Sequence, residues 1–282
     1  DSLKLWNFWK DIFGNDLVKG DYWAKNVLGD DYDQYIDYPL SFEAIKKLPV
    51  EDQKKIKKEL KLKKNKKNLS KNFKEQVAHQ VGPTLQELFF EGYTKKLWGI
   101  ETTEMTADWA PKRIKFTKKS TPFFVNEFTG VGKYGTGHLY EKIKKKIIKN
   151  NGKIFLNHKV TKIQHKDNRI NKIFFGKKNP ITIGRENIIV SSLPITLTAR
   201  LLGFTSNLKF RGVRSVYVAL KSNRCFKNGY NWLYFSDPKI IFNRVTEPKT
   251  MSESLCLKKN QTYLCVEISY SKNDEIDKCN EK

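Results

Sequence analysis

The sequence predicts an α+β protein of several layers, and three observations support this class. Apolar residues recur at helical spacing in the first half, as in 5–13 and 77–89. From Lys153 onward the period changes to two, in short runs separated by turn residues. The last quarter carries longer β-type runs that favour a mainly antiparallel sheet. This order of elements indicates α+β pieces of a multi-layer fold.

Three regions follow from these patterns. Residues 1–150 are expected to be a helical layer, in which Glu51 and Asp52 suit the start of a helix leading into a lysine-rich run. Residues 151–205 are expected to form a β-meander, followed by a strand and helix that return to a nucleotide-binding sheet. The strands expected there are 154–156, 160–163, 170–173, 181–183 and 188–190, and the helix is 195–202. Residues 206–282 are expected to form an antiparallel sheet from strands 213–220, 232–235, 240–245 and 263–270.

Composition and charge narrow the function classes. A chain of 282 residues with 39% hydrophobic content can bury a sizeable core, and no apolar run is long enough to span a membrane. The formal charge of +24 would ordinarily point to nucleic acid, but only eight of the 54 basic residues are Arg. The densest run, 54–67, has no aromatic residue. We interpret it as a solvated helix and loop, with a basic nucleic-acid-binding module as the alternative.

The cysteines predict neither a metal site nor a disulfide framework. Cys225, Cys256, Cys265 and Cys279 are far apart in the sequence and form no CxxC pair or Cys/His ligand set. We expect no metal, and reduced thiols in a cytoplasmic protein, although nothing in the spacing forbids a disulfide.

A literal GxGxxG occurs at residues 130–135, between the strand-like 123–125 and an amphipathic helix at 139–148. In a dinucleotide-binding unit the next strand ends in an acidic residue that binds the ribose, yet here 153–156 is followed by Asn157, His158 and Lys159. Pro122 also lies at the start of the supposed buried strand. We therefore favour a glycine-rich loop whose backbone approaches a ligand closely.

Residues 89–99 are the most informative segment. On a helix, Phe89, Tyr93 and Leu97 share one face with Thr94 beside them. Trp98 at the helix end, followed by a glycine, could stack on a planar base. Packing of the same rings into a core is the alternative, and periodicity alone favours it.

The string Phe-x-x-x-Tyr-Thr-x-Lys-x-Trp-Gly resembles the uridine-binding helix of UDP-galactopyranose mutases, which implies that Phe89, Tyr93, Thr94 and Trp98 line a nucleotide site. Residues 243–249 are similar to the Arg-x-x-Glu-x-Lys strand end of the same family. In that family the arginine contacts the substrate diphosphate, so the resemblance implies this catalytic role for Arg244. A guanidinium suits it because forked donors match two phosphate oxygens. An ion pair of Arg244 with Glu247 at a sheet edge is the alternative.

Other stretches, 107–114, 135–141 and 190–194, resemble the wider amine-oxidase-like flavoproteins, which include protoporphyrinogen oxidases. This resemblance implies an FAD cofactor, with Gly135, Gly137 and His138 near the flavin ring. A solvated His138 at a helix start is the alternative. Arg113 is implied to bind substrate. Mutases carry a second arginine shortly after it, where Lys115 and Phe116 stand here, which leaves the sugar nucleotide open.

The resemblance therefore implies an FAD-dependent, mutase-like enzyme in which the flavin acts at the anomeric carbon of a UDP-hexose. It covers nearly the whole chain, but the flavin-binding segments are expected before Asp1 and after Lys282, so this chain alone is expected to be inactive. Residues 1–150 would then be a substrate cap, 151–205 a return to the FAD domain, and 206–282 the substrate-domain sheet. An FAD-dependent oxidoreductase of the same group, acting on a non-nucleotide substrate, is the alternative. The oligomeric state is not indicated.

Overall fold

The computed structural model describes residues 2–29, 31–62, 70–112, 116–124, 128–226 and 228–279. The chain divides into two compact units, one made of Asp1–Ile143 with Arg211–Lys282 and the other of Lys144–Phe210. The boundary between them falls inside helix α7 (Thr136–Lys149). Each unit contains a sheet of its own, consistent with the α+β class that the sequence predicts.

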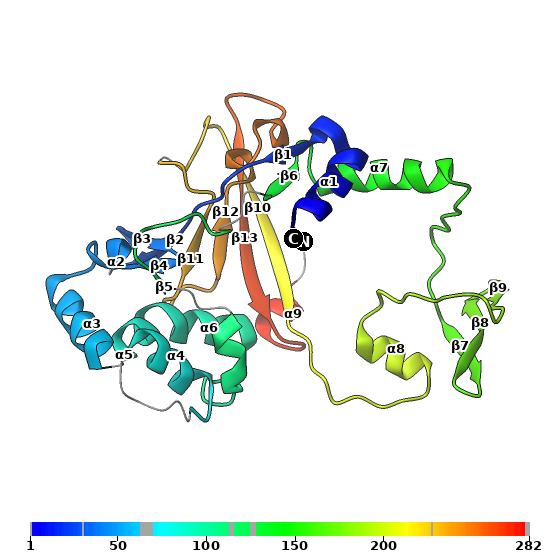
Figure 1. Cartoon of the computed structure of the whole chain (residues 1–282), viewed down its shortest axis with the longest axis horizontal. Coiled ribbons are helices and arrows are strands. Elements are labelled where there is room, and N and C mark those ends of the chain that lie inside the picture. The colour runs from blue at the N-terminus through cyan, green and yellow to red at the C-terminus, as the bar shows by residue number, and fades with distance from the viewer. Residues whose placement is uncertain are drawn as a thin grey trace. The chain divides into compact units, whose positions relative to one another are not determined.

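A six-stranded sheet organises the first unit (Figure 1). β11 and β2 pair in parallel, whereas the other neighbouring pairs are antiparallel. The sheet thus places strands from the start of the chain beside strands from its last quarter. In spatial order the strands are β10 (Gly212–Leu220), β13 (Thr262–Tyr270), β12 (Arg244–Thr246), β11 (Trp232–Phe235), β2 (Ala24–Leu28) and β3 (Gln34–Tyr38).

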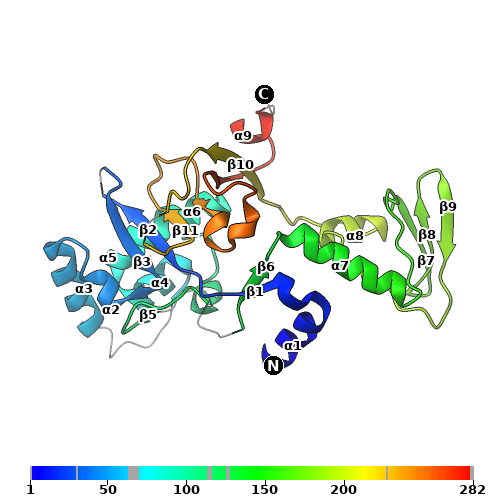
Figure 2. The same cartoon turned by 90° about the horizontal axis from the view of Figure 1, so that it is seen from above.

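A group of helices packs beside this sheet, as Figure 2 shows from above. Apolar side chains at helical spacing form its core, because Ile56, Phe73, Val77 and Leu85 are almost fully buried together with Ile36 of β3. The core therefore fixes the helices against one end of the sheet. The helices are α2 (Phe42–Ile45), α3 (Val50–Leu62), α4 (Phe73–Val81), α5 (Pro83–Leu85), a π-helix (Gln86–Glu91) and α6 (Gly92–Trp98).

The glycine motif does not form a dinucleotide-binding turn. Residues Gly130–Gly132 are strand β6, which pairs antiparallel with β1 (Leu17–Lys19) rather than lying in a parallel βαβ unit. A side chain at Gly132 would place its Cβ 2.6 Å from the carbonyl oxygen of Gly135, so the turn into α7 needs glycine there. The remaining short elements of this unit are α1 (Ser2–Phe13), η1 (Gly14–Asp16), β4 (Leu40–Ser41), η4 (Ala107–Lys112), β5 (Phe116–Thr117), η5 (Pro248–Thr250), η6 (Glu253–Leu255) and α9 (Glu275–Lys278).

The second unit holds a three-stranded antiparallel meander of β7 (Lys162–Lys166), β8 (Arg169–Phe175) and β9 (Lys178–Thr182), with helix α8 (Ile195–Leu201). Asp167 and Asn168 turn β7 into β8 with φ of 50° and 57°, which are the left-handed angles of a tight hairpin. His165 Nε2 lies 3.0 Å from the carbonyl oxygen of Leu202 and links the meander to the end of α8.

Two of the strands predicted for this unit are wrong. Residues 154–156 and 188–190 are not strands, and no described strand pairs with either segment. Ile188 and Val190 are 90% and 89% exposed. Apolar composition alone does not make a strand, because the backbone groups also need a ladder partner.

The prediction of a helical layer over 1–150 is incomplete, because β1 to β6 all fall within residues 17–132. β2 and β3 are five residues each and flank a short loop, so their period of two is too brief to stand out. The strand predicted over 240–245 is also too long, since β12 begins at Arg244. The carbonyls of Ile240 and Phe242 accept hydrogen bonds from a lysine side chain instead of from a neighbouring strand.

Candidate functional site

The aromatic segment is helical, as its spacing predicts, but it begins with a turn of π-helix over Gln86–Glu91. The wider π turn places the consecutive Phe89 and Phe90 both in buried positions. The carbonyl of Phe89 in this turn accepts a hydrogen bond from the Ser236 hydroxyl at 3.3 Å. The π-helix therefore sets the entry to α6 by joining it to the end of β11.

Helix α6 lies directly against the β11–β12 loop. A Cβ at Gly92 would approach the carbonyl oxygen of Ser236 to 2.1 Å, so a larger residue cannot occupy this position without a shift. Lys96 Nζ donates to three carbonyls of the same loop, those of Asp237 at 2.9 Å and of Ile240 and Phe242 at 3.1 Å each. The start and the middle of α6 are thus both held against this loop.

The carboxyl end of α6 is held by an arginine. Arg211 Nη2 and Nε donate to the carbonyls of Lys96 and Leu97 at 2.9 and 3.3 Å, which satisfies two acceptors that a helix leaves open at its end. Gly99 ends the helix with φ +67°, and a Cβ there would lie 2.7 Å from the Arg211 guanidinium. These contacts hold the backbone on both sides of Trp98.

An aromatic cavity of about 200 Å³ opens beside α6. Tyr93, Thr94 and Trp98 line it from the helix. Tyr38 and Tyr234 line it from the sheet. The three tyrosine rings contact edge to face, with centroids 5.2 Å apart for Tyr93 and Tyr234 and 5.5 Å apart for Tyr38 and Tyr234. Trp98 is 39% exposed at the rim, so it is not sealed in the core. The full lining is Asn26, Tyr38, Phe73, Phe89, Phe90, Tyr93, Thr94, Leu97, Trp98, Trp109, Phe123 and Tyr234.

A row of side chains crosses the sheet next to this cavity. Glu267 pairs with Arg244, Arg244 with Tyr234, and Tyr234 with Asn26 in the strand register. Directly opposed residues point to the same face of a sheet, so these four side chains share one face. The guanidinium of Arg244 is therefore a cross-strand neighbour of Tyr234, which lines the cavity.

Arg244 forms a two-point ion pair with Glu267 through Nε and Nη2, with Nη2 2.7 Å from Oε1. The hydrogen bonds that Arg244 donates to Glu267 raise the pKa of Arg244 further above its ordinary value, so the guanidinium stays charged although its side chain is only 38% exposed. The sequence alternative of an ion pair with Glu247 is wrong, because Glu247 is engaged elsewhere.

Burial raises the pKa of the three tyrosine hydroxyls in the cavity. Burial raises the pKa of Tyr38 and of Tyr93 well above the ordinary range. Burial also raises the pKa of Tyr234, and the Arg244 guanidinium only partly opposes this effect. All three rings are therefore neutral at physiological pH and can donate O–H hydrogen bonds.

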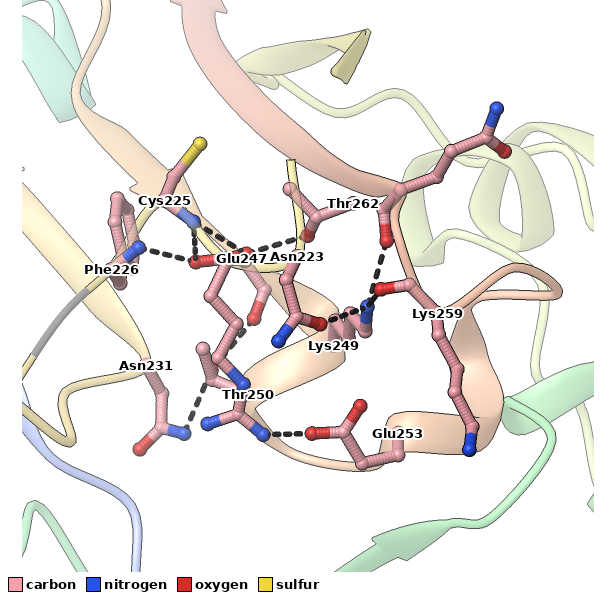
Figure 3. A network of polar contacts seen from close by, with 12 residues as sticks. Asn223, Cys225, Phe226, Asn231, Glu247, Lys249, Thr250, Glu253, Lys259 and Thr262 are labelled. Atoms are coloured by element: carbon pink, nitrogen blue, oxygen red, sulfur yellow. Dashed lines mark hydrogen bonds and ion pairs between the residues drawn. The ribbon is translucent and has the colours of Figure 1, made fainter. Parts of the chain in front are cut away.

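Glu247 and Lys249, the other residues of the Arg-x-x-Glu-x-Lys motif, serve the fold, as Figure 3 shows. The Glu247 carboxylate is fully buried and accepts from the backbone N–H of Cys225 and Phe226 and, at 2.5 Å, from the Thr262 hydroxyl. Lys249 Nζ, also buried, donates to Asn223 Oδ1 at 3.0 Å and to the carbonyls of Lys259 and Gln261 at 2.6 and 2.8 Å. The motif thus places Arg244 near the cavity while its two neighbours secure the loops behind it.

Gly135, Gly137 and His138 do not line this cavity. Arg113 is not among the described residues. Gly135 has φ +90° just before α7, and a Cβ at Gly137, in the first turn of α7, would meet no atom within 4 Å. His138 Nε2 lies 2.8 Å from Asp16 Oδ2, and its side chain is 40% exposed. The structure therefore does not bring Gly135, Gly137 or His138 together with Tyr93 and Trp98.

Sequence reasoning missed the half of the cavity that the sheet supplies. Tyr38, Asn26 and Tyr234 come from strands β3, β2 and β11, which are far from α6 in the chain. Phe123, which the sequence predicts in a strand, lines the cavity from a segment that is not a strand. For Tyr234 a signal was present, because Trp232 and Tyr234 alternate along a strand that the sequence does predict. For Asn26 the sequence carries no such signal.

A family model described as UDP-galactopyranose mutase matches residues 88–278, a span that contains α6, Arg244 and Glu267. The chain belongs to the UDP-galactopyranose mutase family. A probable UDP-galactopyranose mutase from Klebsiella pneumoniae is 34% identical over 71 residues, which are 25% of this chain and 18% of that protein. This match thus involves only a small part of the relative's length.

Solved structures agree on the fold. A reduced UDP-galactopyranose mutase matches with a TM-score of 0.71 at 18% identity, over 91% of this chain and 58% of that one. A putative protoporphyrinogen oxidase from Exiguobacterium sp. 255-15 matches with a TM-score of 0.64 at 12% identity, over 95% of this chain and 63% of that one. An oxidoreductase from Methanosarcina mazei matches with a TM-score of 0.59 at 15% identity, over 89% and 61%. The chain spans less than two thirds of each of these proteins.

Proposed function

We propose that this chain forms the substrate-binding part of an FAD-dependent UDP-sugar mutase, as family membership suggests. One observation carries the proposal. Tyr234 is in ring contact with Tyr93 of α6 and is also the cross-strand neighbour of Arg244, so an aromatic cavity and a permanent cation adjoin. An aromatic slot beside a guanidinium suits a base attached to a diphosphate.

The proposed roles follow from position and chemistry. Tyr93, Thr94 and Trp98 would hold the uridine, with Phe89 supporting them from the buried side of the cavity. Arg244 would bind the diphosphate and stabilise the charge that it gains when the bond to the anomeric carbon breaks. Neutral tyrosine hydroxyls suit neighbouring ligand oxygens because they donate without adding negative charge. Arg113 stays a candidate for substrate binding on the family resemblance alone.

The geometry of the Arg244 ion pair supports this role. Glu267 takes the edge of the guanidinium formed by Nε and Nη2. A guanidinium carries five N–H donors, so the donors that Glu267 leaves, which lie beside the Tyr234 hydroxyl, could also reach phosphate oxygens. Glu267 would then orient the cation without occupying all of it.

The residues of the glycine-rich loop fit a flavin in one respect. Gly137 leaves open space where a side chain would stand, so a planar ring could approach the backbone there. Gly135 and His138 would flank that approach. When bound, FAD would supply the chemistry at the anomeric carbon of the UDP-hexose. We assign residues 1–150 and 206–282 to substrate binding and residues 151–205 to a return toward the FAD domain.

The test compares uridine with UDP by calorimetry on the full-length protein. We expect Trp98→Ala to weaken both ligands, because the base loses its stacking partner. We expect Arg244→Lys to weaken UDP by about tenfold and to leave uridine unchanged, since lysine keeps the charge but loses the forked donors. Arg214→Lys, a change at an arginine that donates to the carbonyl of Cys279, serves as the control. Unchanged UDP affinity in both Trp98→Ala and Arg244→Lys would contradict the proposal.

A second candidate, an FAD-dependent oxidoreductase acting on a non-nucleotide substrate, is favoured by the fold match to the putative protoporphyrinogen oxidase. It predicts substrate oxidation with no UDP binding, which the same calorimetry distinguishes. Among the described residues, no helix has both the length and the apolar character needed to cross a membrane. The four cysteines are free thiols, which supports the cytoplasm as the proposed location.

A further inference from the structure

The wall of the aromatic cavity contains one buried amide with an unused donor. Asn26 lies on β2, lines the cavity and is only 3% exposed. Within the described part of the chain, its Nδ2 is buried and has no hydrogen-bond partner. Buried polar groups in folded proteins are almost always paired, so an unpaired amide on a residue that lines a cavity suggests an acceptor supplied by a ligand.

The neighbours of Asn26 define what that acceptor can be. The cavity surface around it is mainly aromatic, with the rings of Tyr38, Phe123 and Tyr234 among its walls. A flat ring fits between such walls better than a sugar does, because its faces are apolar and its polar atoms lie on its edge. The group that meets Nδ2 is therefore best matched by a carbonyl oxygen on the edge of a base.

The sheet places this amide at a suitable separation from the cation. Asn26, Tyr234 and Arg244 occupy directly opposed positions on β2, β11 and β12. Adjacent strands lie about 4.8 Å apart, so Asn26 and Arg244 are separated by roughly 10 Å along the row. A single nucleotide can reach from one to the other, with its base at Asn26 and its phosphates at Arg244.

We propose that Asn26 is a specificity-determining residue, whose side-chain amide donates to a carbonyl oxygen of the uracil ring and selects uracil over bases without a carbonyl on that edge. The inference rests on the proposed function, because it assumes that the cavity holds a nucleotide. Uracil offers carbonyl oxygens on both sides of N3–H. Adenine offers none.

The test uses Asn26→Leu, a substitution of similar size without polar atoms. Full-length protein is titrated with UDP, uridine and ADP, and its thermal unfolding is measured without ligand. We expect the free protein to be as stable as before or more stable, since an unpaired buried donor is replaced by an apolar group. We expect affinity for UDP and for uridine to fall about fivefold to tenfold, and the preference for UDP over ADP to shrink by the same factor.

Asn243→Leu is the matched control. Asn243 is also buried with an unpaired Nδ2, but its Oδ1 accepts from the Ser269 backbone N–H at 3.1 Å, and it does not line the cavity. We expect this change to lower the melting temperature and to leave the ratio of UDP to ADP affinity unchanged. If Asn26→Leu leaves the ratio of UDP to ADP affinity unchanged while UDP still binds, the role of Asn26 is refuted and the proposed function stands. If the unsubstituted protein binds no UDP, the proposed function fails and takes this inference with it.

Discussion

Lys96 offers a sharp test of how the binding helix is held, because its neighbour provides a matched control. Lys96 Nζ donates to the carbonyls of Asp237, Ile240 and Phe242, which belong to the loop between β11 and β12. Lys95, one position earlier, pairs with Glu101 at 2.5 Å, and both of these side chains are about half exposed. Replacing each lysine by methionine removes the same charge from two different environments.

The expected magnitudes differ several-fold. Each hydrogen bond that Lys96 makes contributes about 1 kcal/mol net, so its loss in Lys96→Met should lower the free energy of unfolding by about 2 to 4 kcal/mol. At about 2 to 4 °C per kcal/mol for a large domain, the melting temperature should fall by roughly 5 to 15 °C. The exposed pair of Lys95 contributes about 0.2 to 1 kcal/mol, so Lys95→Met should change stability little.

Thermal unfolding measures the stability effect, and uridine titration measures the consequence for the site. Because α6 carries Tyr93, Thr94 and Trp98, loss of the Lys96 contacts should also weaken uridine binding, whereas Lys95→Met should not. Equal destabilisation by the two substitutions would refute the reasoning. So would a stable Lys96→Met protein with unchanged affinity for uridine.

Substitutions at Glu247, Asp37 and Gly92 probe the surroundings of the site, with Thr262→Val as the comparison for Glu247. Glu247→Ala should lower the free energy of unfolding by about 3 to 6 kcal/mol in chemical denaturation, because it leaves two backbone N–H groups and a hydroxyl without their acceptor, whereas Thr262→Val should lower it by about 1 kcal/mol. For Asp37, burial alone would raise the carboxyl pKa, but two lysine ion pairs outweigh it and the net pKa is lowered. The ionised Asp37 therefore contributes its full stabilisation above its unfolded pKa, and this contribution is lost as pH falls through the lower folded value. In Asp37→Asn the free energy of unfolding should consequently depend less on pH below about pH 4. Gly92→Ala should weaken both folding and uridine binding, since its Cβ would collide with the Ser236 carbonyl, and normal melting and affinity would contradict the close approach seen there.

The helical half of the site could be predicted from sequence because its information is local. Residues three and four apart share a helix face, so the spacing of Phe89, Tyr93 and Leu97 limits where these side chains can point. The π-helix before α6 could not be predicted, since it depends on contacts with Ser236, far along the chain. The family motif likewise pointed to Arg244 but did not predict its neighbours Glu267 and Tyr234.

The half of the cavity that the sheet supplies depends on pairing between distant strands, which no local sequence pattern encodes. β2 pairs in parallel with β11, and the two strands are about 200 residues apart in the chain. The partner of Arg244 illustrates the same point. Spacing suggested Glu247, three residues away, but the cross-strand register selects Glu267 on β13. A carboxylate three residues along in an extended or turning segment has no fixed relation to the arginine, whereas directly opposed residues do.

The large positive charge of the chain does not by itself explain how a diphosphate would be bound. Lys96 and Arg211 donate to backbone carbonyls around α6, and Lys249 donates to carbonyls and an amide behind the sheet. Because these side chains already donate to protein acceptors, they hold loops in place and have few donors left for a ligand. Arg244 differs because a carboxylate, not a set of carbonyls, takes its Nε and one Nη2 donor, and its remaining donors lie beside the Tyr234 hydroxyl of the cavity. Selectivity in the proposed site would therefore come from one oriented cation next to aromatic walls, and the many surface lysines would only increase the rate at which an anion approaches.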